Sequence, residues 1–270
     1  ILSCLLSVFL LIHTPTQGLQ VAMLDVGQGD GLFIRGPKGS TYLVDGGSSN
    51  VEEVGKYRLE PYLKYSGVRK VDYVFVSHGD GDHYSGIMEM LSRQAVGVRI
   101  RNLVLPENYK NDSNLLRLAM TAKGNDTKVM VMKEGAIVQE DDLKIVCLQP
   151  REESNLTGNA GSMVLEVSYR KFEMLCTGDV EGEGELLLKE KVAGKEYDVL
   201  KVAHHGSKYS SETDFLDAVS IKVALISAGE GNYYGHPHEE TLERLKNEGC
   251  KIYQTSKCGA ITIRTDGNKM

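Results

Sequence analysis

The most informative stretch of the chain reads Ser77-His78-Gly79-Asp80-Gly81-Asp82-His83-Tyr84-Ser85-Gly86. It places two imidazoles and two carboxylates within six residues, directly after the run Val71 to Val76. That run is β-branched and aromatic, which predicts a buried strand that delivers the polar side chains to its C-terminal edge. The glycines in between would let a loop curl so that alternate side chains converge. Nitrogen and oxygen donors at this spacing predict a metal site for zinc, manganese or iron, and the alternative is a solvent-exposed turn.

Three more polar motifs follow apolar runs further along the chain. They are Thr177-Gly178-Asp179, His204-His205-Gly206-Ser207 and Gly235-His236-Pro237-His238. Each would stand at the end of a buried strand, where a rigid backbone holds side-chain geometry well. The sequence therefore predicts one site assembled at the ends of several strands.

These motifs together resemble those of the metallo-β-lactamase-fold hydrolases, and among them the extracellular hydrolase domain of ComEC-type competence proteins, which take up DNA. The matching segments are Leu24 to Asp30, Leu43 to Gly47, His78 to His83, Thr177 to Asp179, Leu200 to Ser207 and Tyr234 to His238. The resemblance implies an α/β fold, the αββα sandwich, in which two mixed β-sheets pack face to face with helices outside. One hydrolase domain would span residues 19–270.

The apolar patterning agrees with many strands separated by helices. Strands are predicted at Gln20–Asp25, Gly31–Arg35, Thr41–Val44, Val71–Val76, Asn102–Leu105, Leu143–Leu148, Ser162–Tyr169, Phe172–Cys176, Val199–Ala203, Ile221–Ser227, Lys251–Gln254 and Ala260–Ile263. Helices are predicted at Val51–Tyr65, Gly86–Gln94, Asn114–Lys123, Gly182–Lys191, Ser211–Ala218 and His238–Asn247.

The resemblance implies roles for the metal-ligating residues. His78 and Asp80 would bind a first metal ion, and Asp82, His83 and His205 would bind a second. Asp179 would bridge the two ions, which a carboxylate can do at the spacing that two-metal hydrolysis uses. The cofactors would be two divalent metal ions, Zn²⁺ or Mn²⁺.

The chain departs from the superfamily pattern at the first metal ion. Asp80 stands where the usual HxHxDH signature has its second histidine, a substitution typical of the competence branch. No histidine lies between His83 and His204, and the segment Asn155 to Ser162 takes the place of the third-motif histidine. Replacing imidazole by carboxylate moves metal preference from zinc toward manganese or magnesium.

Further residues are expected to surround the metal ions. Asp82, His204 and His236 are assigned to catalysis, His204 as a supporting residue or proton shuttle and His236 as a phosphate contact or general acid. We expect neighbouring His204 and His205 to point to opposite faces of a strand, so that only one of them is a ligand. Asp45 would orient the metal-binding loop, with a helix-capping role as the alternative. The candidate substrate-binding residues are Ser207, Lys208, Asn232 and Tyr234.

Composition limits the function classes. A formal net charge of −6 gives no electrostatic sign of nucleic-acid binding, although bound divalent cations would add local positive charge. Lactam hydrolysis is not expected, because in this fold it accompanies a histidine-rich first site. The five cysteines show no CxxC spacing, so neither a zinc ribbon nor a disulfide framework is indicated, and a Cys250–Cys258 pair is left open.

The function implied by the resemblance is metal-assisted hydrolysis of a phosphodiester, with DNA as the substrate during uptake in competence. One alternative is hydrolysis of another phosphodiester or ester, for example by a phosphorylcholine esterase, because one fold serves many substrates. Another is a catalytically silent module of a DNA channel.

The first twelve residues, Ile1 to Ile12, are almost wholly apolar and carry no charge. Spanning a bilayer takes about 20 residues, so we expect residues 1–18 to contain the end of a transmembrane helix. A buried strand and a leader sequence are the alternatives. The expected location is therefore the cell membrane, with the hydrolase domain outside the cell, or else secretion.

Overall fold

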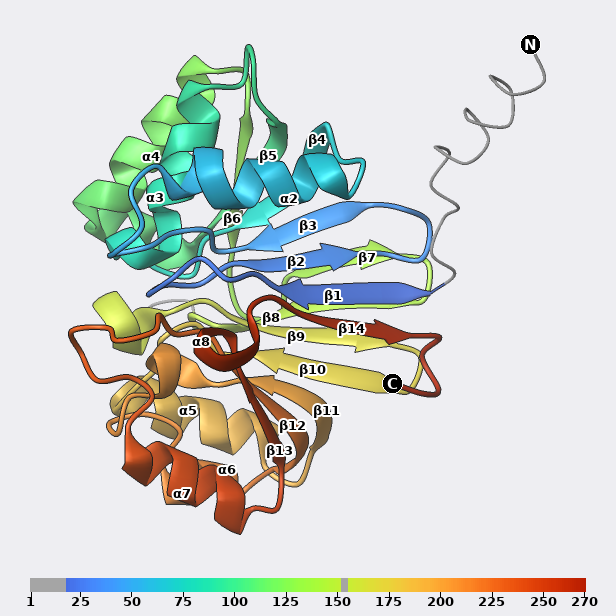
Figure 1. The fold of residues 1–270 in the computed structure, drawn as a ribbon, viewed down its shortest axis with the longest axis vertical. Helices are drawn as coiled ribbons and strands as arrows, with labels where there is room; N and C mark the ends of the chain where they lie inside the picture. Colours follow the sequence, from blue (N-terminus) through green and yellow to red (C-terminus); the bar gives the residue numbers. More distant parts are fainter. Residues whose placement is uncertain (1–17, 152–154) are drawn as a thin grey trace.

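Two seven-stranded β-sheets pack face to face, and helices cover the outer side of each (Figure 1). The computed structural model describes residues 18–151 and 155–270. The first sheet has the strand order β14 (Ile261–Thr265), β1 (Leu19–Met23), β2 (Leu32–Arg35), β3 (Thr41–Val44), β4 (Lys70–Phe75), β5 (Arg99–Pro106) and β6 (Lys128–Met132). The second has the order β13 (Lys251–Gln254), β12 (Ser220–Ile226), β11 (Glu196–Lys201), β10 (Phe172–Cys176), β9 (Val164–Tyr169), β8 (Leu143–Gln149) and β7 (Ile137–Glu140). The predicted αββα sandwich is confirmed.

Helical segments lie between the strands. Those around the first sheet are η1 (Gly55–Leu59), α2 (Glu60–Tyr65), α3 (Gly81–Ser92), η2 (Glu107–Asn111) and α4 (Ser113–Gly124). Those that follow along the chain are η3 (Gly158–Gly161), α5 (Glu183–Val192), η4 (Ala203–Gly206), α6 (Thr213–Leu216), α7 (Glu239–Asn247) and α8 (Thr255–Cys258). In Figure 1, α2, α3 and α4 lie above the first sheet, and α5, α6 and α7 lie below the second.

The buried apolar side chains form three layers, one between the sheets and one beneath each set of helices. Strand β4 contributes side chains to two of these layers. Val74 faces the helices of the first half, whereas Phe75 faces the second sheet, because successive strand residues point to opposite sides. The continuous apolar runs of the sequence are therefore strands that are buried on both faces.

Strand direction brings the polar motifs to one edge. Strands β3, β4, β5 and β6 run parallel to one another, as do β10, β11, β12 and β13. Parallel strands end at the same edge of a sheet, so the residues that follow β3, β4, β10 and β11 gather there. Two sheets packed with these edges together supply one site from both halves of the chain.

The structure differs from the sequence prediction at two strands and two helices, of which the short helix α8 was not predicted. Strands β6 and β7 were also not predicted. Both are sheet edges with half-exposed side chains, and although Val129 to Met132 of β6 are all apolar, only the first two residues of β7 are. Helix α3 begins at Gly81 rather than at Gly86, so Asp82 and His83 lie on its first turn and not on a loop. Gly86 instead marks close packing, since a Cβ there would lie 2.7 Å from the carbonyl oxygen of Gly46.

Two other expectations concern the chain ends and the cysteines. The predicted membrane segment falls on residues 1–17, which lie outside the described residues. Within residues 18–151 and 155–270, no helix has the length and apolar character needed to cross a bilayer. Cys250 and Cys258 are free thiols.

Glu185 predicts a pH dependence of stability. This buried carboxylate on α5 accepts hydrogen bonds from the backbone N–H groups of Ser211 and Glu212, yet burial raises its pKa to about 7 from an ordinary value of 4.5. The unfolded chain therefore releases this proton at lower pH than the folded chain, and folding loses stability as the pH rises from 4.5 through 7. Relative to Glu185→Gln, the wild type should lose about 3 kcal/mol of unfolding free energy across this range.

Urea unfolding of both proteins at a series of pH values measures this difference. Glu190→Gln, on the exposed side of the same helix, is the control. A constant difference between wild type and Glu185→Gln across the range would contradict the assignment.

Candidate metal centre

Asp179 lies at the middle of the site, where the two sheets meet. Its Oδ2 atom is 3.1 Å from Nε2 of His83 and 3.4 Å from Nε2 of His205. His83 comes from α3, on the first sheet, and His205 from η4, at the end of β11 in the second. All three side chains are almost fully buried. The predicted bridging carboxylate therefore faces imidazoles from both halves of the chain.

The Asp45 carboxylate fixes the orientation of His83. Asp45 follows β3 and accepts hydrogen bonds from the backbone N–H of Ser77 at 2.7 Å and from its hydroxyl at 2.8 Å. Its Oδ2 is also 3.0 Å from Nδ1 of His83. Because a carboxylate only accepts, Nδ1 carries a proton, and Nε2 either donates a second proton to Asp179 or, in the neutral ring, has a lone pair that can bind a metal ion. Neighbouring Gly47 is required here, since a Cβ would lie 2.5 Å from the carbonyl carbon of Asp82.

The same logic sets the tautomers of His78 and His205. The hydroxyl of Ser77 donates its hydrogen to Asp45, so at 3.0 Å it accepts from Nδ1 of His78. Nδ1 of His205 is 3.0 Å from the carbonyl oxygen of Ser227 and donates to it. In the neutral form of both rings Nε2 then has a free lone pair, which is the form of histidine that binds metals.

His204 and His205 do not alternate across a strand as we expected. Strand β11 ends at Lys201, and both histidines have left-handed backbone conformations, with φ of 48° and 53°. Such conformations cost roughly 1–3 kcal/mol each and concentrate at functional sites. The turn brings both rings to the cleft, since Nε2 of His204 is 4.0 Å from Asp179 Oδ2 while His205 lies nearer.

Of the remaining predicted ligands, Asp82 and His78 belong to compact ligand groups and Asp80 does not. Asp82 Oδ2 is 3.4 Å from Nε2 of His205, on the same side as His83. His78 lies beside His83, with ring centroids 4.2 Å apart. Asp80 is at the rim, its side chain 61% exposed and its Oδ2 3.5 Å from Nε2 of His78. Among the described residues, the compact ligand groups include His78–His83–Asp179 and Asp82–His83–His205, whereas Asp80 belongs to none of them.

Asp30 and Lys201 are part of the site, and the sequence analysis gave them no role. Both are buried, and Lys201 Nζ forms an ion pair with Asp30 and lies 3.4 Å from Asp179 Oδ1. Asp30 Oδ1 is also 3.4 Å from Nδ1 of His205. A lysine inside the apolar strand Val199–Ala203 was the available signal, because a buried ammonium needs a carboxylate partner.

The pKa values follow from this crowding of charge. Burial raises the pKa of Asp179, but His205, His83 and Lys201 outweigh it and hold that pKa well below its usual value. Burial lowers the pKa of His205, but Asp179 and Asp30 outweigh it and raise that pKa to about 10. The pKa of His83 is raised in the same way by Asp179 and Asp45, against the effect of burial. The centre therefore favours ionised carboxylates and demands positive charge between them.

A divalent cation fits this demand. Nε2 of His78, His83 and His205 is buried, and in each ring it faces carboxylate oxygens at 3.1 to 3.5 Å. In a neutral ring that carries its proton on Nδ1, the Nε2 lone pair would face oxygen lone pairs, which is unfavourable unless a proton or a cation lies between them. Metal ions bind deprotonated imidazole and carboxylate, so a cation would take the place of the protons that the pKa values favour.

The cleft beside the centre has a volume of about 310 Å³ and is open to solvent. Asp82, His204, His205, His236 and Tyr234 are among the residues that line it. Burial, followed by the neighbouring His205 and His204 rings, lowers the pKa of His236 to about 4. The cleft thus brings together the residues assigned to catalysis and one candidate substrate contact.

The other candidate substrate contacts, Ser207, Lys208 and Asn232, are not among the residues that line this cleft. Ser207 is buried and accepts a hydrogen bond from Thr241 through its carbonyl oxygen. The backbone N–H of Lys208 donates to His238 at 3.0 Å. The Asn232 side chain bonds to Gly229 and to His236, within its own loop. Their contacts with substrate remain predictions.

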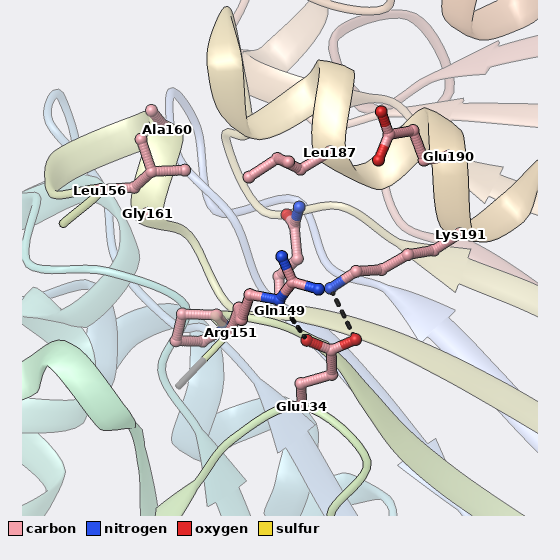
Figure 2. A pocket seen from close by; sticks show the side chains of 10 residues that line it. Glu134, Gln149, Arg151, Leu156, Ala160, Gly161, Leu187, Glu190 and Lys191 are labelled. Atoms are coloured by element: carbon pink, nitrogen blue, oxygen red, sulfur yellow. Dashed lines mark ion pairs between the residues drawn. The ribbon is translucent and has the colours of Figure 1, made fainter. Parts of the chain in front are cut away.

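A second hollow, of about 160 Å³, lies away from the centre between α5 and the end of β8. Figure 2 shows Glu134 between Arg151 and Lys191, with which it forms ion pairs of 3.7 and 3.1 Å. The described residues that line it include no histidine or cysteine. Its charges pair with one another, and its described lining lacks the imidazole nitrogen atoms that mark the metal centre.

Comparison with known proteins agrees with the geometry. The family profile of the Metallo-beta-lactamase superfamily matches residues 24–230, most of the chain. The chain belongs to the metallo-β-lactamase superfamily. The metallo-β-lactamase-fold protein YhfI from Bacillus subtilis covers 92% of this chain with a TM-score of 0.58 at 13% identity, over 100% of its own length. That likeness shows the shared fold.

This superfamily member is also similar to curated competence proteins. It is 30% identical to ComE operon protein 3 of Bacillus subtilis over 97% of this chain and 35% of that protein. It is 32% identical to Competence protein ComA of Neisseria gonorrhoeae over 92% of this chain and 32% of that protein. The chain thus spans about a third of the length of these relatives. The resemblance to ComEC-type competence proteins is confirmed.

The centre predicts that divalent metal stabilises the fold. With Mn²⁺ or Zn²⁺ at 100 times the dissociation constant, the unfolding free energy should rise by about 2.7 kcal/mol, because the unfolded chain lacks the site. Asp179→Asn should abolish this gain, whereas Asp214→Asn, at an exposed carboxylate on α6, should keep it. Thermal unfolding with and without metal tests this, and equal gains in wild type and Asp179→Asn would contradict the assignment.

Asp45 should act on metal affinity through His83. Asp45→Asn keeps the shape of the side chain but removes the anionic acceptor of the Nδ1 proton. Loss of such an orienting partner weakens metal binding about 10- to 100-fold. Competition with a chromophoric chelator measures the affinity. Asp72→Asn is the control, because Asp72 accepts from Thr41 between β3 and β4, away from the centre. An unchanged affinity in Asp45→Asn would show that Asp45 does not orient His83.

Proposed function

We propose that this chain is a metal-dependent phosphodiesterase that cleaves DNA. The observation that carries the proposal is the buried carboxylate of Asp179, which faces the Nε2 atoms of His83 and His205 from two halves of the fold beside an open cleft. Phosphodiesters are anionic, and an anionic substrate needs cations to approach the buried Asp30, Asp45 and Asp179 and the partly exposed Asp82. The metal centre would reverse the local charge where the phosphate binds.

Two ions would be held by residues of this chain. His78, Asp80 and Asp179 would hold the first, and Asp82, His83, His205 and Asp179 the second. When bound, divalent cations supply Lewis-acid charge to the phosphate and make hydroxide available at neutral pH. The oxygen-rich first group favours Mn²⁺ over Zn²⁺, because harder oxygen ligands suit manganese.

The histidines on the solvent side would handle the leaving group. Nδ1 of His204 donates a hydrogen bond to Oε2 of Glu181 at 2.9 Å, and His204 lines the cleft. In the imidazolium form, which also carries a proton on Nε2, the ring would donate a hydrogen bond to a phosphate oxygen or pass that proton to the departing alkoxide. His236 lies next to it, with ring centroids 5.4 Å apart. We assign His204 to protonation of the leaving alkoxide and His236 to contact with the phosphate.

The similarity to proteins named for competence supports DNA as the substrate. We propose that the domain acts on DNA during uptake, on the outer side of the cell membrane. The apolar residues 1–12 support attachment to that membrane.

Removal of the ligands should abolish cleavage. Asp82→Ala and Asp179→Ala should each lower the rate of DNA cleavage by at least about 100-fold, because loss of a ligand is more severe than loss of an orienting partner. The measurement is cleavage of labelled single- and double-stranded DNA in Mn²⁺, with circular dichroism to verify folding. Glu134→Gln, in the second hollow, should cleave at the wild-type rate.

The same assay separates other outcomes. Full cleavage by folded Asp82→Ala or Asp179→Ala protein would overturn the proposal. Turnover of small diesters or phosphorylcholine esters without cleavage of DNA would identify a different hydrolase. Less than one tightly bound ion per chain after reconstitution with metal would instead indicate a catalytically silent module.

A further inference from the structure

A row of aromatic rings leads from solvent to the metal centre. It consists of Tyr233, Tyr234 and His236, and it ends at His204 and His205. Tyr233 and Tyr234 have ring centroids 6.1 Å apart, Tyr234 stacks on His236 at 5.7 Å, and His236 is 5.4 Å from His204 and 6.2 Å from His205. We call this set the aromatic row.

The outer end of the aromatic row is open. Tyr233 is 100% exposed and Tyr234 is 54% exposed, although both are large apolar side chains. Tyr234 also lines the cleft at the metal centre, together with His236 and His204. A lone exposed tyrosine needs no explanation, but consecutive exposed rings that continue into a catalytic cleft offer stacking surface for a flat ligand.

The side chain of Asn232 cross-links the loop that carries the aromatic row. The Asn232 amide donates to the carbonyl oxygens of Gly229 and His236, and its Oδ1 accepts from the backbone N–H of His236 at 3.0 Å. The hydrogen-bonding groups of that amide are therefore occupied within the loop. Residues 229–238 contain no lysine or arginine. The loop thus presents aromatic rings to a ligand and carries no cationic Lys or Arg side chain.

We propose that the aromatic row stacks unpaired bases of single-stranded DNA and so guides one strand into the cleft, an inference that rests on the proposed function. Every base has a π-face, so stacking of this kind tolerates any sequence. In a duplex the base faces are covered by neighbouring bases, and only an unpaired or extruded base can stack on a protein ring. The aromatic row therefore favours single-stranded over double-stranded DNA, while the metal centre binds the phosphate.

The test compares binding to strands with and without bases. A labelled thymidine oligonucleotide with phosphorothioate linkages, which resist cleavage, is titrated with the metal-loaded chain and followed by fluorescence anisotropy. An abasic strand of the same length and linkage is the matched ligand. Tyr234→Ala should weaken binding of the thymidine strand about 5- to 100-fold and leave the abasic strand unchanged. Tyr233→Ala should act in the same direction.

Two variants serve as controls. Tyr234→Phe keeps the ring and should bind like the wild type. Tyr65→Ala removes an 82% exposed tyrosine at the end of α2, outside the row, and should also bind like the wild type. A duplex of the same sequence should bind more weakly than the single strand.

The outcomes distinguish this inference from the proposed function. Unchanged binding in Tyr233→Ala and Tyr234→Ala, or an equal loss for thymidine and abasic strands, would overturn base stacking even if the wild type cleaves DNA. Base-dependent binding that is lost in Tyr234→Ala, in a wild type that cleaves no DNA, would uphold the stacking site and overturn the phosphodiesterase.

Discussion

The approach of His83 and His205 to the carboxylate of Asp179 is the contact on which the rest of the site depends. His83 belongs to the first half of the chain, and Asp179 and His205 belong to the second. Like charges gather at this point, because Asp30, Asp45 and Asp82 approach the same rings. Lys201 offsets part of this charge, and a bound cation would offset the remainder. The arrangement costs stability unless something cationic occupies it, which is why we regard it as built for metal.

The surroundings of the centre show how a protein prepares such a site in advance. Each histidine nitrogen that faces away from the centre has a partner: Asp45 for His83, Ser77 for His78 and Ser227 for His205. These partners fix the tautomer of each ring before any ion arrives. The chain therefore pays the entropy of ordering the ligands during folding rather than during binding.

The motifs at the predicted strand ends predicted the sandwich through their family resemblance. They also drew attention to His78, His83, Asp179 and His205, which the fold brings together, but Asp80 belongs to none of the compact ligand groups of the described chain. The sequence did not predict that Asp82 and His83 begin a helix, because Gly86 resembled a helix start although its role is close packing with Gly46. The expectation that the side chains of His204 and His205 point to opposite faces of a strand was also wrong. Both residues have a left-handed backbone conformation, which depends on tertiary contacts. Asp30 was missed as a partner of Lys201 because the two residues are distant in sequence and meet only once the sheets pack.

The ion pair between Asp30 and Lys201 has a consequence for the folding of the whole chain. Asp30 follows β1 of the first sheet, Lys201 ends β11 of the second, and Ser227 adds a hydrogen bond to the carbonyl oxygen of Gly29 across the same seam. Neither sheet by itself supplies all the candidate metal ligands, because His83 comes from the first half of the chain and Asp179 and His205 come from the second. Separating the sheets would divide the candidate ligands between two pieces and expose the buried charges, so we expect a bound cation to stabilise the docking of the two sheets.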